Sequence, residues 1–326
     1  MRAAPLASRC NRRVLVVGGA RGAARRTLVR QDHARRGTDA IVVSFPSDLA
    51  SPNPEPMVWY QNPRGAASHW AVHTLAPGTA IETGVVVDLF GDGRREVVMG
   101  QEPPMVLAWL APGGDPTQLW KTHPISAPGF PGAGHFVHGL GTGDLDGDGN
   151  VDVLAGNGWF QQTADHDTWT FHAFSFGPDD CSDMRVYDVD ADGRADVLCA
   201  RPHDYGLHWW RQLDGGSFED HLIDATVSQM HALDLADLDG DGLPEIVSGK
   251  RRWAHRPTGD PGAGDPAVLV YWSIRRDSAG GVSFERHEVD AASGIGTELP
   301  VTDVDGDGRP DIVVSNKNGL FYFHQR

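Results

Sequence analysis

The feature that most constrains this chain is an acidic loop that recurs ahead of an apolar strand. In its clearest copy Asp144, Asp146 and Asp148 alternate along the chain, a glycine follows, and Asp152 closes the loop before Val-Leu-Ala-Gly. These carboxylates repel one another unless a cation lies between them. Oxygen ligands at alternate positions, a glycine for the sharp turn and a closing carboxylate are the pattern of a Ca²⁺ loop. The apolar run that follows begins a strand, where an EF-hand would begin a helix.

Three further complete copies begin at Asp188, Asp237 and Asp303, and a partial copy begins at Asp88. In the partial copy Phe90 stands where the second carboxylate is expected, so we expect weak calcium binding there or none. The sequence therefore predicts about four structural Ca²⁺ sites. Including one residue per loop for a backbone carbonyl, the predicted ligands are Asp144, Asp146, Asp148, Asn150 and Asp152; Asp188, Asp190, Asp192, Arg194 and Asp196; Asp237, Asp239, Asp241, Leu243 and Glu245; Asp303, Asp305, Asp307, Arg309 and Asp311; and, in the partial copy, Asp88, Asp92 and Glu96.

The spacing of the loops indicates the architecture. The first residues of successive copies are 56, 44, 49 and 66 residues apart. Repeats of this length that hold several short strands are typical of a β-propeller. Each repeat reads as a strand before the loop, a strand after it, a third strand rich in aromatic residues and a fourth that ends near a histidine. We expect an all-β chain that forms a single β-propeller of four-stranded blades, with six blades favoured and seven as the alternative.

The chain divides into an irregular, leader-like segment at 1–26 and a propeller at 27–326. The first segment is rich in arginine and lacks a convincing secretory h-region. A degenerate copy of the loop at 32–39 lacks the middle carboxylates, so we expect no cation there. The last repeat shows only three strands, and we expect residues 13–17 to supply its fourth strand and close the ring.

Composition and motifs exclude several classes of function. Lys and Arg number 28 against 44 Asp and Glu, a net charge of −16, which argues against a nucleic-acid partner. No apolar run is long enough to span a membrane. The sequence has no Gly-x-Ser-x-Gly elbow and no P-loop, which argues against a serine hydrolase and an NTPase. Of the three cysteines, Cys181 and Cys199 lie on neighbouring strands, and the expected register places Cys199 opposite Arg185, so we expect no disulfide.

Over roughly residues 27–326 the chain resembles the FG-GAP/VCBS repeat family, whose members have calcium-loop blades. The resemblance implies that the strand before each acidic loop is innermost, that the loops lie on the bottom face, and that the protein is secreted, periplasmic or on the cell surface. It says little about function, because propellers serve adhesion, sugar binding and catalysis.

If the acidic loops lie at the bottom, the segments before each first strand and after each second strand lie on top. Five histidines recur in one slot of the repeat, and we assign them to structure: His73, His123, His172, His221 and His287. Five others on the top segments are not explained by the repeat: His135, His138, His203, His231 and His255. With Lys250 and Arg251 they predict a working face at this end.

Three kinds of function fit this face. We favour a carbohydrate-active carbon–oxygen lyase or dehydratase, with His138 or His231 as the base and Lys250 or Arg251 holding the oxyanion. His135 completes the candidate catalytic set, and the histidines also allow a Zn²⁺ or Mn²⁺ ion. The stretch that begins His231-Ala-Leu-Asp resembles the propeller of aldos-2-ulose dehydratases, although this chain has no cupin domain. The alternatives are a non-catalytic glycan-binding or protein-binding module of the adhesion type, and an inert assembly repeat.

Overall fold

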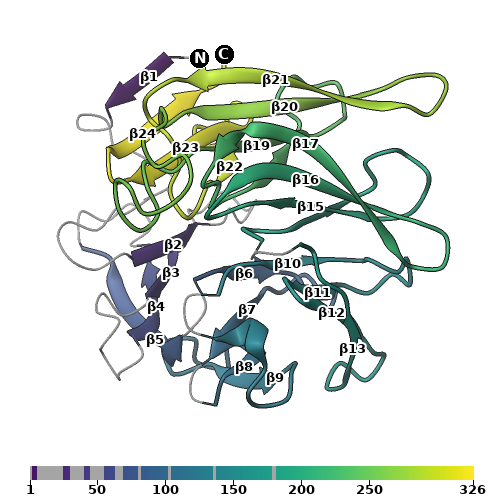
Figure 1. Cartoon of the computed structure of the whole chain (residues 1–326). Helices are drawn as coiled ribbons and strands as arrows, with labels where there is room; N and C mark the ends of the chain where they lie inside the picture. Colours follow the sequence, from purple (N-terminus) through teal and green to yellow (C-terminus); the bar gives the residue numbers. More distant parts are fainter. Residues whose placement is uncertain are drawn as a thin grey trace.

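The computed structural model shows an all-β chain whose strands form six four-stranded sheets, arranged as the blades of a propeller (Figure 1). Every neighbouring pair of strands in the sheets is antiparallel. The predicted fold class is therefore confirmed. The structure describes residues 2–5, 25–29, 40–44, 55–62, 69–79, 82–101, 104–134, 137–177 and 181–326.

Five sheets each use four consecutive strands, joined in order as a meander. Their bounds, sheet by sheet, are β2 (Arg25–Val29), β3 (Ala40–Ser44), β4 (Glu55–Gln61) and β5 (Ala71–Thr79); β6 (Gly84–Val87), β7 (Glu96–Gln101), β8 (Val106–Ala111) and β9 (Lys121–Pro124); β10 (Leu140–Gly143), β11 (Asp152–Ala155), β12 (Gly158–Gln162) and β13 (Trp169–Ala173); β14 (Arg185–Tyr187), β15 (Asp196–Ala200), β16 (Tyr205–Gln212) and β17 (Phe218–Ser228); β18 (Asp234–Ala236), β19 (Glu245–Gly249), β20 (Leu269–Arg276) and β21 (Val282–Asp290). A short 3-10 turn, η2 (Pro131–Ala133), precedes β10.

The remaining sheet joins the two ends of the chain. It orders β1 (Arg2–Pro5), β24 (Gly319–His324), β23 (Asp311–Asn316) and β22 (Val301–Thr302). β1 runs antiparallel to β24, with Arg2 opposite His324. A strand from the start of the chain thus completes the last blade and covers the edge that β24 would otherwise expose. The predicted closing segment at 13–17 lies outside the described residues, and residues 2–5 occupy this position.

Where the structure describes side chains, the second strands of the blades form the core between blades. β11, β15 and β19 are buried along their whole length. Successive side chains of a strand point to opposite faces, so each strand packs against both neighbouring blades. In β19, Ile246 packs in a cluster with Leu198 and Trp209, whereas Val247 packs in another with Ile312 and Phe323. The first strands β6, β14, β18 and β22 are mostly half-buried, in keeping with their innermost position.

The recurring histidines have the structural role that was predicted for them. Each lies on a fourth strand, directly opposite an aromatic residue of the third strand, and the two rings are in contact. The best stacked pair, Trp109 and His123, has ring centroids 3.7 Å apart and an interplanar angle of 5°. The other pairs are Trp59 with His73, Trp159 with His172, Trp209 with His221 and Tyr271 with His287.

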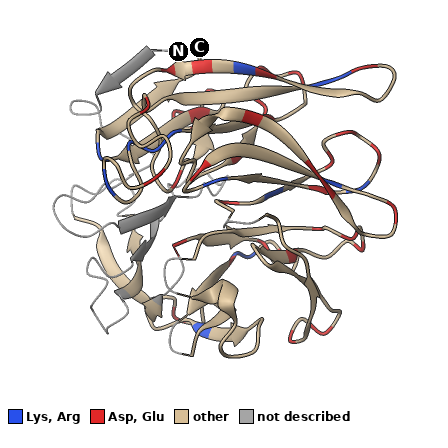
Figure 2. Ribbon diagram, in the orientation of Figure 1, with Lys and Arg blue, Asp and Glu red and all other residues tan. Residues whose placement is uncertain are grey.

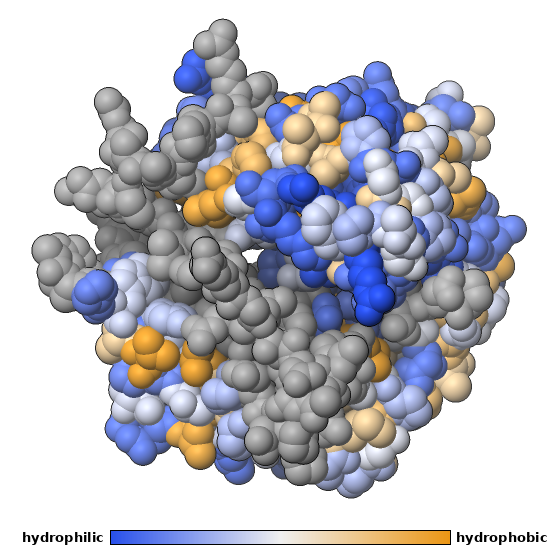
Figure 3. All heavy atoms as spheres, turned by 60° about the vertical axis from the view of Figure 1, so that its left-hand side comes forward, coloured by the Kyte–Doolittle hydropathy of each residue, from blue (hydrophilic) through white to orange (hydrophobic). Residues whose placement is uncertain are grey.

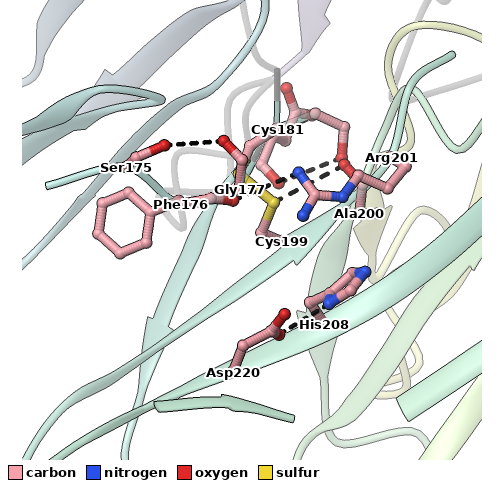
Figure 4. The surroundings of a disulfide bond; sticks show 11 residues. Ser175, Phe176, Gly177, Cys181, Cys199, Ala200, Arg201, His208 and Asp220 are labelled. Atoms are coloured by element: carbon pink, nitrogen blue, oxygen red, sulfur yellow. Dashed lines mark hydrogen bonds and ion pairs between the residues drawn. A yellow bond between two sulfur atoms is a disulfide. The ribbon is translucent and has the colours of Figure 1, made fainter. Parts of the chain in front are cut away.

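The expectation of no disulfide is wrong. Cys181 and Cys199 are bonded, with Cα atoms 5.4 Å apart, inside the usual range for a bridge (Figure 4). The pairing of β14 with β15 begins with Arg185 opposite Leu198. Before that point the chain leaves the extended ladder, because the backbone N–H of Met184 donates to Leu140 in the neighbouring blade. The expected register is thus off by one residue, and the backbone N–H of Ser182, which donates to Ala200 at 2.8 Å, holds the segment with Cys181 against the end of β15.

The described surface carries many acidic side chains and few large exposed apolar ones. Red acidic positions outnumber blue basic ones along the ribbon (Figure 2), and the view in Figure 3 is largely hydrophilic. The large exposed apolar side chains are spread over several blades: Val72, Leu119, Phe171, Tyr205 and Leu222. Among the described residues, no helix has the length and apolar character that crossing a membrane would require.

Candidate metal centre at one end of the propeller

Three histidines from three blades meet at one end of the propeller. His138 lies two residues before β10, His203 lies three residues after β15, and His231 lies three residues before β18. Neighbouring strands are antiparallel, so the start of a first strand and the end of a second strand lie at the same end of a blade. The acidic loops join the opposite ends of these strands. The structure thus brings the predicted residues His138 and His231 together and adds His203.

The three imidazole rings form a compact triangle. The ring centroids are 5.0 Å apart for His138 and His203, 5.1 Å for His138 and His231, and 5.0 Å for His203 and His231. Nε2 of His138 lies 3.1 Å from Nε2 of His203. One ligand atom from each of the three side chains lies within 4.8 Å of the other two. Three imidazoles at this spacing are the ligand set of many zinc enzymes.

In each ring Nδ1, the nitrogen on the side away from the other two histidines, lies toward an oxygen atom. Nδ1 of His138 lies 3.7 Å from the Glu82 carboxylate, and Nδ1 of His203 lies 3.9 Å from the Asp260 carboxylate. Nδ1 of His231 donates to the backbone carbonyl of Gln229 at 3.1 Å. Its Nε2 is buried and has no hydrogen-bond partner in the part of the chain that the structure describes. The hydrogen bond of His231 fixes its tautomer and leaves Nε2 for an ion, as is common in histidines that bind metals.

The surroundings keep two of these rings neutral. Burial lowers the pKa of His231 well below its ordinary value, and the nearby charge of Arg251 lowers it further. Burial is also the largest cause that lowers the pKa of His203, followed by His255. A neutral imidazole is the form that binds a metal, so the cluster is suited to a cation.

A loop at 251–266 covers this end of the fifth consecutive blade. The side chain of Gln229 holds the loop at two points. The side-chain oxygen of Gln229 accepts a hydrogen bond from the backbone N–H of Ala254 at 2.9 Å, and its side-chain amide donates to the carbonyl of Pro261 at 2.9 Å. The loop brings two further groups to the cluster. The His255 ring stacks on His203 with centroids 4.5 Å apart, and Nδ1 of His255 donates to Asp260 at 3.0 Å.

The remaining predicted catalytic residues are placed differently. His135 lies outside the described residues. Lys250 is almost fully buried, and its ammonium group donates to the backbone carbonyls of Arg251 and Arg252. Arg251 lies close enough to His231 to lower its pKa, and its backbone N–H donates to Gln229. The structure therefore places Arg251 beside the histidine cluster, while the charge of Lys250 serves the backbone of the 251–266 loop.

Lys317 adds a second basic side chain near the end of the propeller where the three histidines meet. Its ammonium group donates to the carbonyl of Trp253 at 2.6 Å and lies 5.4 Å from the centre of that indole ring. Burial, then the charge of Arg251, lowers its pKa to about 8. This end of the propeller thus combines buried imidazoles with the basic side chains of Arg251 and Lys317.

Glu82, His203, Asp260 and Lys317 are not in the catalytic set that the sequence predicted, although His203 was among the histidines assigned to the working face. A repeat signal was present for one of them, because Glu82, like His138, stands two residues before the first strand of its blade. His203 was noticed as unexplained, but nothing local showed that it joins His138 and His231. Asp260 lies in a loop that is absent from the other repeats, so no spacing pointed to it.

The acidic loops at the opposite end share one hydrogen-bond pattern. The first carboxylate accepts from the backbone N–H five residues on, as from Gly149 to Asp144 at 3.0 Å. The third accepts from the residue two positions on, as from Asn150 to Asp148 at 2.8 Å. The equivalent donors to the first and third carboxylates are Gly193 and Arg194, Gly242 and Leu243, and Gly308 and Arg309 in the other complete loops.

The closing carboxylate of each loop is buried. Asp152 accepts from the backbone N–H of Leu145 at 2.9 Å, and burial raises its pKa to about 7. Burial raises the pKa of Glu96, Asp196 and Glu245 as well. A buried carboxyl group among other carboxylates is the environment that a bound cation stabilises. Calcium binding by these loops stays a prediction.

The loops differ in the side chains around them. In the loop that begins at Asp188, Arg211 forms ion pairs with Asp190 and Asp192, and Arg194 also pairs with Asp192. In the partial loop Phe90 contacts the rings of Trp109 and His166, each with centroids 4.8 Å away. His324 lies 3.3 Å from Asp305 and 3.2 Å from Asp311. Fixed positive charge from arginine competes with a cation, so the loops are not equivalent.

Comparison with known families identifies the repeats. The model of the FG-GAP-like repeat matches residues 188–248, and that of the FG-GAP repeat matches residues 295–323. Both matches include an acidic loop and the buried strand after it. No curated protein matches the sequence.

Solved structures that resemble most of this chain include the following two proteins. A lectin from Agrocybe aegerita, described as recognising non-reducing terminal N-acetylglucosamine, has a TM-score of 0.53 and 14% identity over 92% of this chain and 77% of its own. AofleA from Arthrobotrys oligospora has a TM-score of 0.49 and 12% identity over 93% of this chain and 83% of its own. At these identities the likeness concerns the fold alone.

Proposed function

This chain is a β-propeller of FG-GAP repeats, and we propose that it is a carbohydrate-active carbon–oxygen lyase whose metal centre is formed by His138, His203 and His231. A propeller fold does not define an activity, so the proposal rests on the site. The observation that carries it is the triangle of imidazoles, with centroids 5.0 to 5.1 Å apart, whose outward nitrogens each face an oxygen. No packing requirement of the repeat explains that arrangement.

The donor set favours Zn²⁺ over Mn²⁺. All three ligands are imidazole nitrogens, which suit zinc, whereas manganese prefers carboxylate and water ligands. Three protein ligands leave one position of a tetrahedral ion open, which is the pattern of catalytic zinc. An ion with neutral ligands keeps its full charge and acts as a Lewis acid on a carbonyl oxygen.

The surrounding residues fit an elimination on a sugar. In that reaction the carbon next to a carbonyl loses a proton, and the C–O bond one carbon further on breaks as a hydroxyl group leaves. Negative charge develops on the carbonyl oxygen, and the cation of Arg251 beside His231 stabilises it. Lys317, whose pKa is lowered to about 8, has a substantial neutral fraction near physiological pH and is a candidate for the group that accepts the proton.

Three observations support a carbohydrate substrate and an extracellular setting. The guanidinium group of Arg251 is suited to the carboxylate of a uronate, and the Agrocybe aegerita lectin of similar fold is described as recognising a sugar. The bond between Cys181 and Cys199 is typical of proteins that fold in an oxidising compartment. We propose that the protein is secreted, periplasmic or held at the cell surface.

The test begins with the ion. The protein is stripped with a chelator, saturated with Ca²⁺ and titrated with Co²⁺, whose visible bands report a four-coordinate nitrogen site. We expect bands for the parent and for His221→Ala, a histidine outside the cluster, and none for His203→Ala. Glu82→Gln should weaken binding by about 10- to 100-fold, because it removes the charge behind His138. A parent with no such bands refutes the metal centre.

The second stage is activity. The zinc-loaded protein is incubated with ketosugars and uronate-containing glycans, and an unsaturated product is followed by its ultraviolet absorbance. We expect turnover by the parent and by His221→Ala, and a loss of at least about a hundredfold in His203→Ala. If glycans bind at this end of the propeller and none is turned over, the protein is a non-catalytic glycan-binding module. If a protein partner binds there instead, it is an adhesion-type module.

A further inference from the structure

The outer side of His203 carries a second group of ligand atoms that the three-histidine centre does not use. His203, His255 and Asp260 each place one such atom within 4.8 Å of the other two. We propose that these residues hold a second metal ion and that His203 is shared, with Nε2 toward the first ion and Nδ1 toward the second. This inference rests on the proposed function only in taking the three-histidine centre as the site of the first ion.

The distances leave an atom of His203 unexplained. Nδ1 of His255 donates to Oδ1 of Asp260 at 3.0 Å, an ordinary charge-assisted hydrogen bond. Nδ1 of His203 lies 3.9 Å from the same oxygen, which is too long for a hydrogen bond. This nitrogen is buried and has no hydrogen-bond partner among the described residues. A cation that binds Oδ1 of Asp260 and Nδ1 of His203 would give this nitrogen a partner.

The chemistry of the group differs from that of a simple ion pair on the surface. Asp260 is only 10% exposed in its side chain, and its other oxygen accepts from the backbone N–H of His255 at 3.1 Å. That hydrogen bond orients the carboxylate, so Oδ1 faces the two imidazoles. Two nitrogens and one carboxylate oxygen are a common ligand set for zinc and related ions, with room for a water molecule or a substrate.

The loop that supplies His255 and Asp260 is held in place. Gln229 binds it at Ala254 and Pro261, and further along Tyr205 donates its hydroxyl to Asp265 at 2.5 Å. The same Gln229 accepts from His231. Gln229 therefore contacts both His231 of the first centre and the loop that supplies His255 and Asp260. These hydrogen bonds hold the loop in place before an ion binds.

Sharing His203 has a chemical consequence. A neutral imidazole has one nitrogen that binds a metal and one that carries a proton. When the second ion binds, the ring gives up that proton to the solvent and bridges the two ions as an imidazolate. Binding of the second ion therefore releases one proton more than a site with an unshared histidine would release.

The experiment counts ions. The whole chain, stripped and then saturated with Ca²⁺ to fill the acidic loops, is dialysed against Zn²⁺, and bound zinc is measured. We expect two equivalents for the parent and for His221→Ala, and one for His255→Ala and for Asp260→Asn. Asp260→Asn preserves the size of the side chain and removes only its charge. His203→Ala should lose both equivalents or weaken both.

A second measurement tests the shared ring. With two Cu²⁺ ions bound, the parent should give a reduced electron paramagnetic resonance signal, because an imidazolate couples the two spins. Asp260→Asn, with one ion, should give the full signal of one spin.

The outcomes separate this inference from the proposed function. One equivalent in the parent that survives in His255→Ala and disappears in His231→Ala overturns the second position and leaves the three-histidine centre intact. Two equivalents that survive in both His255→Ala and Asp260→Asn place the second ion elsewhere and overturn the inference. No bound zinc in the parent overturns both. Two full, uncoupled copper signals exclude the shared histidine.

Discussion

The backbone carbonyl of Gln229 accepts a hydrogen bond from Nδ1 of His231 at 3.1 Å. Gln229 itself has a left-handed backbone, with φ of 54°, which is uncommon for a residue other than glycine. This conformation turns the chain just before β18, so that the carbonyl faces His231 while the side chain binds the 251–266 loop. One strained residue thus orients a histidine of the centre and the loop that covers it.

Gln229→Ala separates these two roles. The backbone carbonyl remains, so the orientation of His231 should persist, while two partly buried hydrogen bonds are lost. We expect the free energy of unfolding to fall by about 2 kcal/mol. The backbone amide of Ala254, which donates to the lost side chain, should exchange its hydrogen faster. Gln118→Ala, at an exposed glutamine, is the control, and equal exchange at Ala254 in both variants contradicts the assigned contact.

The acidic loops predict that calcium stabilises the fold. Excess EGTA should lower the melting temperature, because a ligand that binds only the folded state stabilises it by mass action. Asp148→Ala should remove one equivalent of bound calcium. Asp165→Ala, at an exposed carboxylate outside the loops, should remove none. A melting curve that EGTA leaves unchanged contradicts the prediction.

The loop that begins at Asp188 should bind calcium more weakly than the other complete loops, because Arg211 forms ion pairs with two of its carboxylates. Arg211→Gln should therefore raise the calcium affinity of this loop.

The features that the sequence predicted correctly are local and repeated. An acidic loop, the strand after it, an aromatic third strand and a histidine on the fourth strand recur in several blades, and a pattern that recurs cannot be a chance arrangement. The propeller follows from these units, because each blade must cover the apolar faces of its neighbours.

The features that the sequence could not predict depend on closure of the ring. His138 and His203 are 65 residues apart and meet only when neighbouring blades pack. The disulfide was missed because it depends on where the chain leaves the ladder before β14, which strand patterns do not reveal. The 251–266 loop has no counterpart in the other repeats, so the roles of His255 and Asp260 required the structure.

Asp152 predicts an opposite pH dependence with and without calcium. Burial raises its pKa to about 7 from an ordinary value of 3.8. The folded state therefore binds more protons than the unfolded state between these values, and without calcium stability should fall as pH rises through this window. With calcium bound, protons compete with the ion, so stability should fall as pH decreases. Urea unfolding in EGTA measures the first trend, and Asp152→Asn, which cannot titrate, should lack that contribution. If the stability of the parent and that of Asp152→Asn change with pH in parallel in EGTA, the prediction is contradicted.

The disulfide should contribute to stability through the unfolded chain. Cys181 and Cys199 are 18 residues apart, and closing a loop of that size stabilises a fold by about 3 kcal/mol. Dithiothreitol should lower the urea midpoint of the parent by a corresponding amount. The double variant Cys181→Ser, Cys199→Ser should start at that lower midpoint and not respond to reductant. A parent midpoint that is insensitive to complete reduction contradicts the prediction.

The left-handed turn of the acidic loops predicts a stabilising substitution. Ala191 has φ of 60°, whereas the equivalent positions of the other complete loops are glycines, such as Gly147 with φ of 76° and Gly240 with φ of 80°. A left-handed alanine costs roughly 1 to 2 kcal/mol, and glycine avoids this cost but gives the unfolded chain more freedom.

Ala191→Gly should therefore stabilise the protein by about 1 kcal/mol or less, measured as a higher urea midpoint in EGTA. Calcium should add to the effect, because the relaxed turn allows Asp190 and Asp192 to approach an ion. Ala279→Gly, in an exposed turn without left-handed strain at that residue, is the matched control and should be neutral or slightly destabilising. If both substitutions lower the midpoint equally, the backbone of Ala191 carries no strain that glycine relieves.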